Sequence, residues 1–248
     1  LETLGEARSA REKGGFIWIA CVSPERSELE EIAREFSIHP LSIEDCFDED
    51  QIPKVDVFPE YAEILFNDIH ITDFSGTIAI EEINLFFGKD FVVSVFRSET
   101  ARRVSADSIA ESVARANPHG AHGSDRIVHA ILDRIIDLTF TAVDSLSDAV
   151  TELEEECLTR EAAIDPAKTH AIRQDLALVR KCLFHERELL ARLSRKDSPV
   201  VPGESIVFFC DLYDHVAKFL GTVETDRDTV ANLAQFSLLV VVNAFVGA

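Results

Sequence analysis

Apolar residues recur every three or four positions along the C-terminal half of the chain, and this spacing leaves little choice of fold. The first such seam runs through Leu132, Ile135, Thr139, Val143, Leu146, Val150, Leu153 and Cys157. Alternating steps of three and four are the heptad pattern of a helix that buries one narrow stripe. About 30 residues in such a helix reach roughly 45 Å. The pattern predicts a long helix packed lengthwise against others.

Two further seams follow, each after a short loop. The second runs from Leu176 to Leu193, and the third runs from Phe209 to Leu233. Asp165-Pro166 ends the first helix, and the turn residues of 197–203 end the second. We therefore predict a long helical hairpin over residues 126–200 and a stalk helix over residues 201–248.

In residues 1–125 the apolar residues are spaced differently, and this spacing predicts an α/β domain. Short runs rich in β-branched and aromatic residues occupy 16–22, 54–58, 61–66, 78–87 and 91–96. The turn Gly88-Lys89-Asp90 predicts that the last two runs form a hairpin. Ser23 is expected to cap a helix that Pro24 opens, and Pro40 to open another. The predicted fold class is α+β: an N-terminal α/β sandwich domain followed by long antiparallel helices and a stalk helix.

The net charge of the chain limits the classes of partner that it can bind. Lys and Arg number 24 against 45 Asp and Glu, a formal net charge of −21. Such a chain repels phosphate backbones and attracts cations, so we expect no nucleic-acid partner and expect divalent metal ions. No P-loop, nucleophile elbow, HExxH or glycine-rich dinucleotide turn occurs, and we expect no enzyme. The five cysteines form no CxxC pair and predict free thiols rather than a zinc ribbon.

Three groups of polar residues are candidate sites, and each has a plain alternative. Glu44 and Asp45 are adjacent carboxylates on the short helix that follows Pro40. Asp211 and His215 are four apart and so share one helix face. An acidic run lies at the end of the first seam, at Glu152, Glu154, Glu155 and Glu156. Each group suits either a hydrated divalent ion or an ordinary solvated surface. A fourth arrangement, His129 and Asp133 with Asp214 and His215, would suit a metal-dependent phosphohydrolase, the enzyme alternative.

Several of these segments together resemble the CorA family of divalent-cation channels. The resemblance rests on residues 38–45 (Ile-His-Pro-Leu-Ser-Ile-Glu-Asp), 51–56 (Gln-Ile-Pro-Lys-Val-Asp) and 86–95, and on matches at 153–156, 211–215 and 223–228. It covers nearly all of residues 15–235 in order. It implies a homopentamer with a funnel on the cytoplasmic side of the inner membrane, passing Mg²⁺ and also Co²⁺ and Ni²⁺. A zinc-transporting branch of the family shares the same funnel.

The resemblance also implies where metal binds. By motif match, Asp45 of one chain and Asp211 of the next would hold Mg²⁺ between subunits and keep the channel closed. Glu44, Asp133 and His215 would form a neighbouring second site. The expected function is thus a cytoplasmic regulatory domain that gates a magnesium/cobalt channel. A zinc-transporting relative and a soluble metal-sensing scaffold without a pore remain open.

The family's two membrane helices and its Gly-Met-Asn pore motif have no counterpart in these residues. The resemblance therefore implies the soluble part of a membrane-embedded protein. The uncharged tail, residues 229–248, departs from the family pattern because it contains no basic residue. It is expected to be a helix end buried in a bundle, and a partial approach to the membrane is the alternative.

Overall fold

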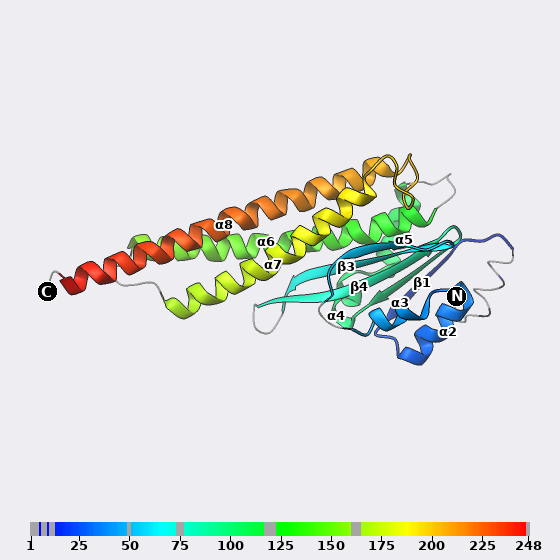
Figure 1. The fold of residues 1–248 in the computed structure, drawn as a ribbon, viewed down its shortest axis with the longest axis horizontal. Helices are drawn as coiled ribbons and strands as arrows, with labels where there is room; N and C mark the ends of the chain where they lie inside the picture. Colours follow the sequence, from blue (N-terminus) through cyan, green and yellow to red (C-terminus); the bar gives the residue numbers. More distant parts are fainter. Residues whose placement is uncertain are drawn as a thin grey trace.

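The computed structural model describes residues 5, 9, 13–48, 51–72, 77–116, 123–159 and 165–246. Within the last helix it describes side chains as far as Phe236. A layered α/β region occupies one end of an elongated molecule, and three long helices run over it and beyond it (Figure 1). The arrangement is the predicted α+β class, with a mixed sheet and long helices.

The sheet has five strands in the order β1-β5-β4-β3-β2. Their bounds are β1 Ile17–Val22, β2 Lys54–Val57, β3 Tyr61–Ile71, β4 Ile78–Gly88 and β5 Phe91–Phe96. Strand β1 is parallel to β5, and every other neighbouring pair is antiparallel. The hairpin predicted from Gly88-Lys89-Asp90 is confirmed, because Phe87 pairs with Val92 across it.

Helices cover both faces of the sheet, because successive side chains of a strand point to opposite faces. Helices α2 (Arg26–Phe36) and α3 (Pro40–Asp45) pack on the face that carries Tyr61 and Phe86. Helices α5 (Ala106–Ala116) and α6 (Ser124–Thr159) pack on the face that carries Ile64 and Phe66, and the short α4 (Ser98–Arg103) follows β5. The predicted α/β sandwich is therefore a helix–sheet–helix arrangement.

One local prediction in this region is wrong. Ser23 does not cap α2, since its main-chain N–H still donates to the Phe96 carbonyl of β5 at 2.8 Å and its φ is 44°. Glu25 precedes the helix instead, and its N–H donates to the Glu28 carboxylate at 2.8 Å. The strand ends at Val22, as predicted, and the helix begins at Arg26 rather than directly after Ser23. Pro40 does open α3, as predicted.

The three long helices are confirmed, with bounds close to those of the seams. They are α6 (Ser124–Thr159), α7 (Pro166–Leu193) and α8 (Ile206–Val246). Pro166 follows an Asp165 cap, whose carboxylate accepts from the Ala167 N–H at 2.9 Å. The seam leucines are shut off from solvent, as Leu132, Leu176 and Leu212 show with 0% exposure. At 36 residues, α6 is longer than the roughly 30 predicted.

Helices α6 and α8 run parallel in a constant register. The Ser205 hydroxyl, just before α8, donates to Asp125. Further along, the His129 and Phe208 rings lie 5.5 Å apart, and those of Phe140 and Phe219 lie 5.8 Å apart. At the far end the Ser147 hydroxyl donates to Asp226 at 2.6 Å. The sequence separation of these pairs stays at 79 or 80, so the two helices keep matching faces over six turns.

Helix α6 joins the sheet and the bundle into one apolar core. Its buried residues contact β3 on one side and α8 on the other. The division at residues 125 and 200 stays a prediction. The expected loop at Asn117–Gly120 and the side-chain burial of the tail beyond Phe236 lie outside the described residues.

A search of the described residues for a helix with the length and hydropathy needed to cross a membrane finds none.

The buried seam of α7 gives a stability prediction. Leu183 has 0% exposure, whereas Leu178 on the same helix has 40%. Leu183→Ala should lower the free energy of unfolding by about 2–5 kcal/mol, because it leaves a cavity in a close-packed core. Leu178→Ala should change it by less than about 1 kcal/mol. Urea unfolding of both variants checks this, and equal losses would contradict the seam assignment.

Candidate functional site

Helices α6 and α8 bring Asp133 together with Asp211 and His215. The constant register aligns the first turns of both helices, so these groups lie within electrostatic range of one another. Burial raises the pKa of the Asp133 carboxyl. His129 and His215 oppose that rise, while Asp137 and Asp211 add to it. The sequence predicted Asp133 and His215 as members of one site, and the fold does bring them together.

His129 belongs to the same cluster, which we name the α6–α8 cluster: His129, Asp133, Asp211 and His215. Burial lowers the pKa of the His129 imidazole, against the opposing charges of Asp133 and Asp211. The sequence suggested His129 only for the phosphohydrolase alternative, because its register against α8 is not visible in the sequence. A neutral imidazole is a metal ligand, so His129 adds a potential nitrogen donor.

The carboxylates of the α6–α8 cluster lack cationic partners. Among the described residues, no lysine or arginine forms an ion pair with Asp133 or Asp211. Asp133 is half-buried and Asp211 is exposed. Yet no three His, Cys, Asp or Glu side chains of the described chain converge closely enough to cage an ion. One chain therefore offers part of a divalent site, which water or further protein ligands would complete.

The second predicted pair, Glu44 and Asp45, lies on α3. Glu44 is exposed, and the Asp45 side chain is 29% exposed. Lys54 of β2 places its Nζ 2.5 Å from Asp45 Oδ2 and 3.6 Å from Asp56 Oδ2. The Gln51 side-chain amide donates to the Asp45 carbonyl at the end of the helix. Burial alone would lower the pKa of Lys54, but the hydrogen bond and charge of Asp45, together with the charges of Glu63 and Asp56, outweigh it and raise that pKa.

A buried carboxyl lies beneath this ion pair. Glu63 of β3 is 1% exposed, and its Oε1 has no hydrogen-bond partner. Glu63 pairs with Asp56 on the neighbouring strand β2. Burial raises the pKa of Glu63 to about 7, against the hydrogen bond from Ser42 and the charge of Lys54. The sequence analysis missed Glu63, although a carboxylate inside the apolar run of residues 61–66 is itself a signal.

The two sets of predicted ligands lie on opposite sides of the sheet. Helix α3 belongs to the layer on one face, and α6 belongs to the layer on the other, with α8 packed against α6. Asp45 and Asp211 therefore do not share an ion within one chain. Their pairing between chains stays a prediction.

The acidic run at the end of α6 lies at the surface. Lys168 of α7 pairs with Glu156 at 2.8 Å and with Glu152 at 3.8 Å, whereas Glu154 and Glu155 are exposed. The contacts are those of a solvated helix face tied to the neighbouring helix.

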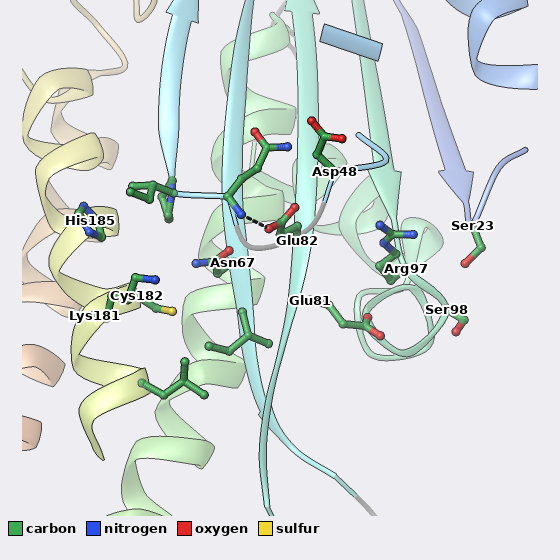
Figure 2. Close-up of a pocket in the computed structure, with 15 residues that line it drawn as sticks. Ser23, Asp48, Asn67, Glu81, Glu82, Arg97, Ser98, Lys181, Cys182 and His185 are labelled. Atoms are coloured by element: carbon green, nitrogen blue, oxygen red, sulfur yellow. Dashed lines mark hydrogen bonds between the residues drawn. The ribbon is translucent and has the colours of Figure 1, made fainter. Parts of the chain in front are cut away.

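Two cavities lie near these groups. One, of about 700 Å³, adjoins Glu44 and has an aromatic wall in which the Phe58 and Tyr61 rings stack 4.5 Å apart. The other, of about 550 Å³, separates α7 from the sheet, with Lys181 and His185 on one side and Arg97 on the other (Figure 2). Two of its carboxylates are engaged by protein donors: Glu82 accepts from the Gln51 N–H, and Glu81 accepts from Thr100. The sequence analysis identified neither cavity.

The same fold occurs in solved structures of the CorA and ZntB proteins. The soluble domain of CorA from Methanocaldococcus jannaschii has the same fold, with a TM-score of 0.73 at 20% identity, over 91% of this chain and 88% of that one. The ZntB cytoplasmic domain from Vibrio parahaemolyticus shares it with a TM-score of 0.66 at 11% identity, over 88% and 84%. At these identities the likeness concerns the fold alone.

Sequence comparison gives the family. The profile of the CorA-like Mg²⁺ transporter proteins matches residues 13–241, so the chain belongs to that family. The cobalt/magnesium transport protein CorA of Thermotoga maritima is 28% identical over 229 residues. That alignment spans 91% of this chain and 64% of the relative, so the chain corresponds to less than two thirds of the relative's length.

The buried carboxyl of Glu63 predicts a pH-dependent stability. Because its pKa is raised in the folded chain, the carboxyl favours folding below about pH 4.5 and disfavours it as the pH rises through about 7. Glu63→Gln should therefore stabilise the protein by roughly 2–3 kcal/mol at pH 8 and by little at pH 4.5. Urea unfolding at both values checks this. The exposed Glu31→Gln is the control, and a gain from Glu63→Gln that does not depend on pH would contradict the assignment.

Proposed function

We propose that this chain is the cytoplasmic regulatory domain of a CorA-like magnesium/cobalt channel, and that divalent cations bound between subunits gate its transport. The observation that carries the proposal is the α6–α8 cluster, in which Asp133 and Asp211 lie within electrostatic range of each other on two parallel helices, with no lysine or arginine of the described residues paired to either. Family membership supports the transport of divalent cations, and the relative from Thermotoga maritima is named for cobalt and magnesium.

The donor set suits Mg²⁺. Carboxylate oxygens are its preferred protein ligands, and the ion keeps much of its water, so it does not need a closed cage. Asp211 and Glu44 are both exposed, as a ligand shared with a second copy must be. Asp45 of one copy and Asp211 of the next would form one site, and Glu44, Asp133 and His215 the other.

Charge supplies the gating step. Each chain carries a formal charge of −21, so copies placed side by side repel one another. An ion held between two carboxylates turns that repulsion into attraction, and the free energy of binding then stabilises the interface. Loss of the ion loosens the assembly, and we propose that this loosening opens the channel in the membrane-embedded protein.

A zinc-transporting relative is the second candidate. His129 and His215 support it, since imidazole nitrogen is a better ligand for Zn²⁺ than for Mg²⁺. Under this alternative, zinc would raise the melting temperature at concentrations far below those at which magnesium does so. A metal-sensing scaffold without a pore would respond to metal in the same way but would have no membrane segments. The coding sequence following the Ala248 codon distinguishes that case.

The metal site gives a direct prediction. Mg²⁺ should slow proteolysis of the parent protein, and Asp45→Ala combined with Asp211→Ala should abolish that protection, because each removes a ligand from one half of the shared site. The control pair is Asp107→Ala with Asp228→Ala, which removes the same charge from exposed positions on α5 and α8. Limited proteolysis across a MgCl₂ titration measures the effect. Undiminished protection of the Asp45/Asp211 variant would refute the site.

A further inference from the structure

Lys54 lies against one of the proposed metal ligands, and this contact carries a consequence for metal affinity. We propose that Lys54 competes with the divalent ion for Asp45 and so sets the ion concentration at which the site fills. The inference rests on the proposed function, because it requires Asp45 to be a metal ligand. It concerns the regulation of that site rather than its existence.

The backbone holds Lys54 and Asp45 in place. Lys54 opens β2, and Asp56, two residues further on, points to the same face of the sheet. Helix α3 is tied to that face at its start, where the Tyr61 hydroxyl accepts from the His39 N–H at 2.9 Å, and at its end, where Gln51 donates to the Asp45 carbonyl. The short contact between ammonium and carboxylate is therefore built into the packing of α3 on the sheet.

The ammonium and the metal ion compete for the same oxygen. Lys54 Nζ is 2.5 Å from Asp45 Oδ2, so an ion that binds this oxygen must displace the ammonium. An ion that uses the other oxygen still lies close to a fixed positive charge. Either route weakens binding, since the ion and the ammonium are attracted to the same carboxylate.

Asp56 gives the displaced ammonium a second partner. Its Oδ2 is already 3.6 Å from Lys54 Nζ, and Glu63 lies across the strand from it. A small rotation of the lysine side chain would thus exchange Asp45 for Asp56 without leaving the ammonium unpaired. The exchange makes the Asp45 site weak but usable, which suits an ion that is abundant in cells rather than one held permanently.

The other half of the site has no such competitor. Among the described residues, neither Asp133 nor Asp211 forms an ion pair with a lysine or arginine. Metal binding at the shared site would therefore begin from a free carboxylate on α8 and end with the displacement of Lys54 from α3. Lys54 is a positioning and affinity-setting residue in this sequence of events.

The test is a Mg²⁺ titration of the melting temperature and of protease resistance. Lys54→Gln should lower the midpoint Mg²⁺ concentration by roughly threefold to fivefold, the upper part of the range expected for a partly exposed ion pair. Lys54→Arg keeps the charge and should stay within about twofold of the parent. Asp56→Asn removes the alternative partner and should raise the midpoint. Melting temperatures without metal show whether each variant is folded.

Lys168→Gln is the matched control. Lys168 also bridges two carboxylates, and its side chain is 33% exposed against 35% for Lys54, but it lies at the start of α7, beside the C-terminal end of α6. The midpoint Mg²⁺ concentration of the Lys168→Gln variant should equal that of the parent. If Lys54→Gln moves the midpoint no more than Lys168→Gln does, or raises it, the role of Lys54 is wrong while the metal site stands. If the parent itself does not respond to Mg²⁺, the proposed function fails, and the inference about Lys54 fails with it.

Discussion

Burial of helix α6 along its whole length is the constraint on which the rest of the structure depends. Its apolar residues contact the sheet on one side and α8 on the other, within a single continuous core. A rotation of α6 about its axis would expose Ile131 or Leu132, both of which have 0% exposure. Because α6 cannot rotate, α8 cannot slide against it either, and the register that aligns Asp133 with Asp211 is fixed by apolar packing. The polar cluster is thus positioned by the apolar packing of the two helices.

The two halves of the proposed site differ in how their charge is balanced. On α3, Lys54 neutralises Asp45, and the nearby Glu63 is buried with a pKa raised to about 7. On α6, the like charges of Asp137 and Asp211 act on Asp133, and the imidazoles of His129 and His215 oppose them. Asp45 thus has a lysine beside it in the absence of metal, whereas no lysine or arginine of the described residues pairs with Asp133 or Asp211. Such an asymmetry favours reversible binding over permanent occupancy.

Much of this fold could be predicted from the sequence, because its strongest signals are local. The heptad seams and Pro166 located the long helices within a few residues, and Gly88-Lys89-Asp90 located the hairpin. Ser23 was assigned wrongly because a hydrogen bond to Phe96, remote in the sequence, ties it to the end of β5. The ligand types at Asp133, Asp211 and His215 were foreseen, but the place of His129 beside them depends on a helix register that no local pattern encodes. The contact between Lys54 and Asp45 depends in the same way on how α3 rests on the sheet.

The separation of the two ligand sets by the sheet has a consequence for symmetry. If ions join Asp45 of one copy to Asp211 of the next, as we propose, the contact joins two different surfaces, unlike the contact between like surfaces in a two-fold dimer. Head-to-tail contacts of this kind close into a ring when the rotation at each step divides a full turn evenly. In such a ring every chain lends one half-site to the neighbour on its left and the other to the neighbour on its right. The loss of a single ion would then weaken the interface between two chains, and each of these chains also contacts its other neighbour in the ring.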